Sequence, residues 1–353
     1  ANTHAIFMEG STGNVMFGGS TFDNGNFSGS ANGVNIFDAT HPIMLLKETT
    51  SNNTFEMGLT TAAAFVATQD AIPMKFATTD TVVFELAADG APSTPTAGTS
   101  NVRLGVNAGD SIASGGNFNV VIGDEAGTAL TTGDSNVAIG FKALFTEDAH
   151  GANVAIGDST LRNLNAGANG FNTAVGNEAG TSVTTGKENT LIGATAGDAL
   201  TDADFNVALG VSALSSDTLG SRSTALGYGT LGSQNFTTAT NVYNVAVGHA
   251  AGNNISTGVR NTTVGGLALQ SDTLGSNSVA VGYATLNNQN FTTATDAFNT
   301  AVGSLAGLSI TTGSHNTLIG AQVGDALTVG TSNIGVGYAA LSSDTKGSKS
   351  VAI

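Results

Sequence analysis

One stretch decides the fold of this chain: Asn-Thr-Ala-Val-Gly-Asn-Glu-Ala-Gly-Thr-Ser-Val-Thr-Thr-Gly, residues 172–186. Its opening pattern returns throughout residues 99–353. Each copy has Asn or Ser, two small or β-branched residues, one aliphatic residue and then Gly. The closing glycines are Gly105, Gly123, Gly140, Gly157, Gly176, Gly193, Gly210, Gly227, Gly248, Gly265, Gly282, Gly303, Gly320 and Gly337. Most of them follow one another at a step of 17 residues.

A step of this length is too short for a repeat built from two helices, but it suits one turn of a β-solenoid. In a solenoid each coil stacks on the previous one, and the chain grows along one axis without enlarging its core. Proline is absent after residue 95, as expected where every coil needs its backbone N–H groups for sheet hydrogen bonds. We therefore predict an all-β chain dominated by a parallel β-solenoid, or β-roll, of about 15 coils.

The composition divides the chain into three parts. All four prolines and all five methionines precede residue 98, and residues 91–98 form a linker rich in Pro, Thr and Gly. Residues 1–90 contain short apolar runs separated by Gly, Asn, Asp and Thr, which predict a mostly-β N-terminal domain. A short helix is expected over Thr60–Val66 in this domain. Residues 99–353 form the solenoid shaft.

The alternation of side chains in a strand predicts the role of each position in the repeat. Thr173 and Val175 lie on one face of the strand and Ala174 on the other. We expect the aliphatic Val175 to face the coil interior and the small Ala174 to meet a second surface, such as a neighbouring subunit. Gly176 marks a turn that needs a positive φ or a close backbone approach. The amide of Asn172 is expected to bond to backbone groups or to the Asn of the next coil.

A longer period lies over the basic coil. Tyr228, Tyr283 and Tyr338 are 55 residues apart, and an insertion of four residues recurs at the same interval. The insertions bring aromatic residues into an aromatic-poor chain: Phe236, Tyr243, Phe291 and Phe298. These residues are candidates for recognition, for example by stacking on sugar rings, or for a latch between coils or subunits. We favour the latch.

Charge and composition exclude several kinds of partner. The net charge of −16 repels a phosphate backbone, so no nucleic acid is expected to bind. The chain has no cysteine, which excludes disulfides, thiol catalysis and thiolate metal sites. No run of 18 apolar residues occurs, so no membrane insertion is expected.

The sequence contains no recognisable catalytic or metal site. The five histidines, His4, His41, His150, His249 and His315, are scattered singly, without the spacing of metal ligands. Calcium-binding solenoids need Asp at one fixed place in every coil, and the acids here are irregular. We expect no catalytic residues, no metal and no cofactor. A polysaccharide-degrading tailspike is the enzymatic alternative, but the sparse acids lack the paired arrangement that such enzymes use.

The block at residues 172–186 resembles the repeats of bacteriophage tail-fibre and related virion fibre proteins. The version at Asn277–Gly282 is similar, more loosely, to repeats of trimeric autotransporter adhesin heads. The resemblance covers residues 99–353, and the runs Met74–Thr79 and Val82–Gly90 also resemble short β-modules of phage fibres. It implies a homotrimer of three β-rolls around a shared axis, exposed at a surface and acting in attachment.

The resulting functional hypothesis is a non-enzymatic structural fibre protein of a phage tail or virion. It would act in host-cell attachment as a spacer and receptor-binding element. Its expected partners are two further copies of itself, other virion or fibre components, and a host surface glycan or protein. Its expected location is the virion tail, outside the cell. The alternative is a bacterial surface adhesin or secreted filament with the same trimeric β-roll. We expect the chain to be a piece of a longer protein.

Overall fold

The computed structural model describes residues 97–353 throughout. Before them it describes the strands β1 (Ile6–Met8), β2 (Val15–Phe17), β3 (Ile43–Lys47), β4 (Thr54–Leu59), β5 (Ala64–Thr68), β6 (Met74–Thr78), β7 (Thr81–Leu86) and β8 (Pro92–Ser93). The chain separates into two compact units, Ala1–Pro92 and Ser93–Ile353. The division falls inside the segment 91–98 that the sequence indicates as a linker.

The N-terminal strands form three small antiparallel arrangements. β1 pairs with β2, β4 lies between β3 and β5, and β6 pairs with β7. The helix predicted over Thr60–Val66 is wrong, because Ala64–Thr68 is strand β5, paired with β4. Phe65 and Val66 are bulky residues that favour strands, and pairing with β4 supplies their backbone hydrogen bonds. The described residues contain no helix, and hence none that could cross a membrane.

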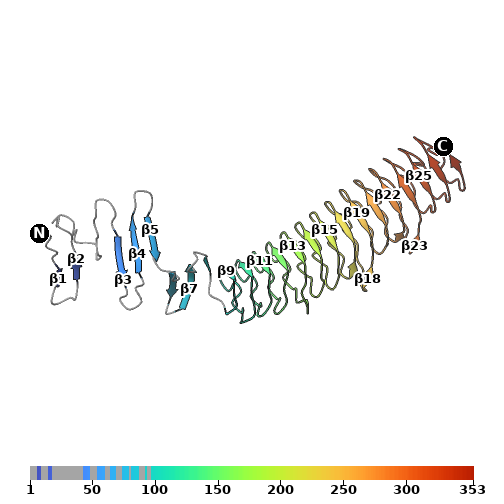
Figure 1. Cartoon of the computed structure of the whole chain (residues 1–353). Coiled ribbons are helices and arrows are strands. Elements are labelled where there is room, and N and C mark those ends of the chain that lie inside the picture. The colour runs from blue at the N-terminus through green and yellow to red at the C-terminus, as the bar shows by residue number, and fades with distance from the viewer. Residues whose placement is uncertain are drawn as a thin grey trace. The chain divides into compact units, whose positions relative to one another are not determined.

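The second unit is a parallel β-solenoid, and this confirms the predicted fold. Its principal sheet has 15 strands that follow one another in chain order, one strand from each coil (Figure 1). The strands are β9 (Val102–Leu104), β10 (Val120–Ile122), β11 (Val137–Ile139), β12 (Val154–Ile156), β13 (Thr173–Val175), β14 (Thr190–Ile192), β15 (Val207–Leu209), β17 (Thr224–Leu226), β19 (Val245–Val247), β20 (Thr262–Val264), β22 (Val279–Val281), β24 (Thr300–Val302), β25 (Thr317–Ile319), β26 (Ile334–Val336) and β27 (Val351–Ala352).

Every strand of this sheet pairs in register with its neighbours, so equivalent residues form straight columns along the solenoid. In β13 and β14, for example, Thr173 pairs with Thr190 and Val175 with Ile192. The four-residue insertions add two short parallel sheets beside the main one. They pair β16 (Gly220–Ser221) with β18 (Thr240–Asn241), and β21 (Gly275–Ser276) with β23 (Thr295–Asp296).

The direction in which the strand residues point is opposite to the prediction. Ala174, at the middle of β13, is fully buried in the coil, whereas Thr173 and Val175 are only partly buried. The aliphatic residue before each Gly therefore faces outward, and the small residue faces the core. The prediction was wrong because it assigned the larger side chain to the interior without accounting for the side chains that enter from the other side of the coil.

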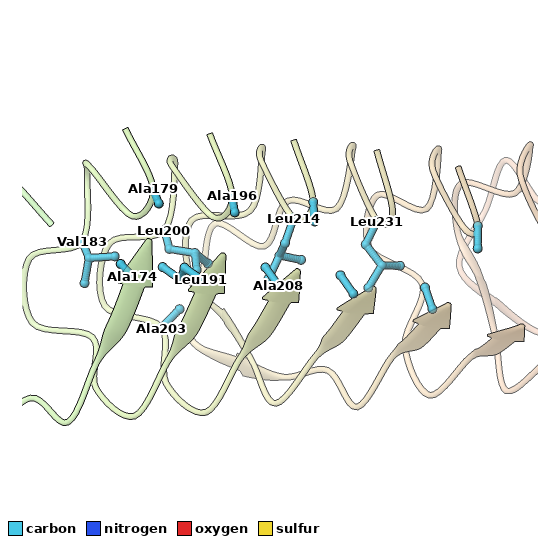
Figure 2. Packing of buried hydrophobic residues seen from close by; sticks show 14 of the residues in the cluster. Ala174, Ala179, Val183, Leu191, Ala196, Leu200, Ala203, Ala208, Leu214 and Leu231 are labelled. Carbon is cyan, nitrogen blue, oxygen red and sulfur yellow. The ribbon is translucent and has the colours of Figure 1, made fainter. Parts of the chain in front are cut away.

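Those side chains are large, and they explain why the middle strand residue is small. Leu200, Leu214 and Leu231 are fully buried and lie across the coil from the strands (Figure 2). Their volume leaves room for little more than Ala at most middle positions, because protein interiors are close-packed. The core is one continuous cluster along the described solenoid.

The half-repeat that follows each Gly fills this core in two ways. In one class a Gly follows Ala and the large side chain comes three residues later, as with Gly197 and Leu200. In the other class a Leu takes the place of that Gly and the residue three positions later is usually polar, as with Leu214 and Asp217, although Leu161 is followed by Leu164. A Cβ at Gly197 would lie 2.8 Å from side-chain atoms of Leu191 and Leu200, so the first class has no room for a second large residue.

The fourteen repeat glycines, Gly105 to Gly337, lie directly after their strands with φ between 118° and 138°. This conformation is rarely open to residues with a Cβ. The coils also approach closely here, since a Cβ at Gly193 would lie 2.5 Å from the carbonyl oxygen of Gly210 in the next coil. These positions therefore combine an unusual φ with a backbone contact between coils.

Candidate interaction surface

The outward face of the 15-stranded sheet, which we call the strand face, carries only Val, Thr, Ile and Leu at its two outward columns. Leu209 is 44% exposed, Val247 37% and Ile319 43%. The solvated face of a sheet is normally polar, so an uncharged face of this length, made of aliphatic residues and Thr, is unusual for a chain in water. Large exposed apolar patches mark interaction sites.

Two further columns flank the strand face at the corners of the coil. The leading column contains the residue directly before each strand-opening Asn or Ser, and the trailing column contains the residue directly after each repeat Gly. Leading-column residues adopt the left-handed conformation, including Tyr243 at φ 57° and Phe298 at φ 49°. A bulky residue rarely adopts a positive φ, so the coil geometry imposes the position of these side chains.

Side chains in the leading column stack along the solenoid axis. The guanidinium carbon of Arg222 lies 4.6 Å from the ring centre of Phe205 and 6.0 Å from that of Tyr243. Further along, the ring centres of Phe298 and His315 are 5.3 Å apart. These contacts are cation–π and aromatic pairs between neighbouring coils.

The four aromatic candidates of the insertions fall into two pairs. Phe236 and Phe291 are buried, with 7% and 5% exposure, and their backbone N–H groups donate to Asp217 and Asp272 of the preceding coil. They occupy the position of a latch between coils. Tyr243 and Phe298 are 52% and 50% exposed and belong to the leading column. Only the second pair can contact a partner.

Inside the coil, the strand-opening asparagines form a buried hydrogen-bonded ladder. Oδ1 of Asn189 accepts the backbone N–H of Asn206 at 2.9 Å, and Nδ2 of Asn189 donates to the carbonyl oxygen of Ala203 at 2.8 Å. The same pattern recurs in coil after coil. Each amide therefore satisfies backbone groups that would otherwise be buried without partners.

Ser replaces Asn at Ser223, Ser278 and Ser350. At Ser223 and Ser278 the ladder changes, because a Gln of the insertion coil, Gln234 or Gln289, enters the core. Its Nε2 donates to the Ser hydroxyl and to the buried Asp217 or Asp272. Burial raises the pKa of Asp272 above its ordinary value, although hydrogen bonds from Gln289, Phe291 and Gly275 act in the opposite direction.

One group of side chains has the residue types of a metal centre. The ligand atoms of Glu147, Asp148 and His150 lie within 4.8 Å of one another. However, the buried Glu147 accepts the backbone N–H groups of His150 and Ala166, each at 3.2 Å. Asp217 accepts the N–H groups of Gly220 and Phe236 in the same way. Glu147 therefore acts as a capping carboxylate of the coil.

The strand face and its two flanking columns were not predicted from the sequence to form a surface. The signal was present, because the column before Asn alternates between large aromatic, charged and small residues while the Asn itself hardly varies. A position that must fill a coil interior would not tolerate such changes.

Comparisons of the chain with protein-family models, with curated proteins and with solved structures find no match.

Proposed function

We propose that this chain is a structural fibre protein of a phage tail or virion, and that its solenoid forms a homotrimeric shaft. One observation carries the proposal: the uncharged strand face, made of Val, Ile, Leu and Thr, continues over all 15 strands of the principal sheet. At about 4.8 Å per coil the face is about 70 Å long. Association of three copies through this face would remove it from water.

The distribution of charge supports this assembly. The chain has 26 acidic and 10 basic residues, but none of them lies at the outward positions of the 15-stranded sheet. Copies with a net charge of −16 each repel one another over most of their surface. The strand face is the long stripe where this repulsion is weakest and where apolar burial stabilises contact.

The resemblance of residues 172–186 to phage fibre repeats supports a position on the virion, outside the cell, and a role in host attachment. The shaft would act as a spacer that joins other fibre components to a host surface glycan or protein. The looser resemblance at Asn277–Gly282 supports the alternative, a bacterial surface adhesin or secreted filament. Both proposed functions are non-enzymatic. They agree with a coil whose inward side chains pack in the core and whose repeat glycines contact the next coil.

Assembly is tested by the mass in solution. Sedimentation equilibrium of the wild-type protein is expected to give three times 34.9 kDa. Ile192→Lys places a charge on the strand face, in strand β14, and is expected to shift the protein toward monomers without unfolding the coil. Thr184→Lys adds the same charge at an exposed position away from that face and serves as the control. A monomeric wild-type protein would contradict the trimer.

Attachment is tested separately with labelled protein on bacterial cells. A phage fibre is expected to bind the host and to reduce adsorption of the phage that carries it. Protein displayed by the bacterium that encodes it, with no effect on phage adsorption, would favour the adhesin. Degradation of host polysaccharide by the purified chain would contradict a non-enzymatic role.

A further inference from the structure

The exposed aromatic residues of the solenoid are confined to the two columns that flank the strand face. The leading column holds Phe118, Phe171, Phe205, Tyr243 and Phe298. The trailing column holds Phe141, Tyr228, Tyr283 and Tyr338. Within the described solenoid, every Phe or Tyr that is clearly exposed belongs to one of these columns, so the distribution follows the geometry of the coil.

The two columns complement one another coil by coil, because no coil has Phe or Tyr in both. Phe205 shares its coil with Val211, and Phe298 shares its coil with Ser304. Where the trailing residue is Phe or Tyr, the leading residue is neither: Tyr283 shares its coil with Asn277. The coil of Tyr243 has His249 in the trailing column.

This complementarity has no explanation within a single copy. The leading and trailing residues of one coil are six residues apart and lie at opposite ends of a three-residue strand, with at most about 20 Å between them. Side chains at that distance do not touch. A large residue on one side of the strand therefore has no direct effect on the space available at the other.

Contact between copies does explain it. If the leading column of one copy lies against the trailing column of the next, no pair contains two Phe or Tyr rings, and most of the exposed rings meet a smaller side chain such as Asn177, Val211 or Ser304. Close packing at an interface favours this arrangement, because two large rings at one position would overlap and hold the copies apart.

The pattern also selects the register. A shift of one coil in one direction would bring Phe205 opposite Tyr228 and Phe118 opposite Phe141. A shift in the other direction would bring Tyr243 opposite Tyr228 and Phe298 opposite Tyr283. The unshifted arrangement separates all the Phe and Tyr rings, whereas a shift of one coil in either direction does not.

We propose that copies of this chain associate in parallel and at the same height, with the leading column of one copy packed against the trailing column of the next. This contact between the two columns, which we call the seam, places Arg222 of one copy opposite Tyr228 of its neighbour, a favourable cation–π pair. This inference rests on the proposed self-association and specifies its geometry. The face between the columns is at most about 20 Å wide and about 70 Å long, so it offers up to roughly 1,400 Å², compared with about 800 Å² that a typical interface buries on one partner.

Engineered cysteines test the seam, because the natural chain has none. Arg260→Cys with Gly266→Cys puts one thiol in each column of the same coil. A Cβ at Gly266 would meet only the ring of Tyr283, at 3.7 Å, so the substitution fits. The two positions are too far apart for a bond within one chain. Oxidation, or a short bis-maleimide, is expected to link chains covalently up to three on a non-reducing gel.

The matched control is Arg260→Cys with Ser304→Cys, two coils further along. The expected offset of about 10 Å exceeds the reach of a disulfide, so little linkage is expected. Equal linkage in both variants, or linkage only in the control, would overturn the seam. Linkage that stops at two chains would leave the seam standing and contradict the trimer. A protein that sediments as a monomer would contradict the proposed assembly itself.

A size exchange keeps the test independent of cross-linking. Ser304→Phe places two rings opposite each other at the seam and is expected to weaken association at least tenfold. Adding Phe298→Ser to the same chain restores one large and one small residue and is expected to recover most of that loss. The two positions are distant within a copy, so they should act independently there. Additive effects of the two changes on association would overturn the proposed contact.

Discussion

Gln234 occupies the place that Ser223 leaves open in the asparagine ladder. Its Nε2 donates to Oγ of Ser223 at 3.0 Å, and its Oε1 accepts from Nδ2 of Asn244 at 2.9 Å. The amide comes from the insertion coil but performs, inside the core, the task of the missing Asn. The 55-residue period is therefore a period of the buried polar network as well as of the surface.

Replacing Gln234 with Ala should destabilise the solenoid around this coil. The change removes one hydrogen-bond partner of the Asp217 carboxylate and one of the Asn244 amide, both buried. Each buried hydrogen bond that is lost without replacement costs about 1–3 kcal/mol. Gln322→Ala, at a partly exposed position, is the control. Denaturant unfolding that does not distinguish the two variants would contradict this role of Gln234.

The regular ladder makes a second prediction, at Asn189. Asn189→Ala removes the acceptor of the Asn206 N–H and the donor to Ala203, so both backbone groups are left buried and unpaired. A loss of about 1–3 kcal/mol for each group is expected. The local measurement is hydrogen exchange, which should speed up at the Asn206 amide. Asn177→Ala, exposed in the trailing column, should leave that exchange rate unchanged.

Much of the architecture could be predicted from the sequence, because a solenoid repeats one local solution. The step of Gly176, Gly193 and Gly210 fixes the length of the coil, and the pattern around Asn172 fixes the strand. Burial could not be predicted in the same way. Whether Ala174 or Val175 faces inward depends on which side chains cross the coil from the opposite side.

The candidate surface was hidden for a related reason. Tyr243 was a candidate for recognition or for a latch because it belongs to an insertion. Its exposure, however, follows from its place in the leading column, which it shares with residues of coils that have no insertion. A column becomes visible only when the register is known, since the insertions shift the numbering by four residues. The role of Gln234 was similarly unpredictable, because its partners Ser223 and Asn244 lie in different coils.

The turn glycines are expected to tolerate no side chain. Gly193 has φ 134°, and a Cβ there would lie 2.5 Å from the carbonyl oxygen of Gly210. Gly193→Ala should therefore cost more than about 3 kcal/mol, through backbone strain together with steric overlap. Gly167→Ala is the control, because Gly167 has φ 65° and nothing lies within 4 Å of its Cβ position. Its cost should be about 1–2 kcal/mol, the price of the left-handed conformation alone. Similar melting temperatures for the two variants would contradict the close contact between coils.

The buried Asp272 should make stability depend on pH. Burial raises the pKa of this carboxyl above its ordinary value of 3.8, so the folded chain binds a proton that the unfolded chain has already released. The free energy of unfolding therefore falls as the pH rises from 3.8 through the raised pKa, and this contribution is constant above it. Asp272→Asn removes the titration. The stability difference between wild type and variant should change with pH only within that interval. A difference that stays constant from pH 3 to neutrality would show that Asp272 titrates alike in the folded and unfolded chains.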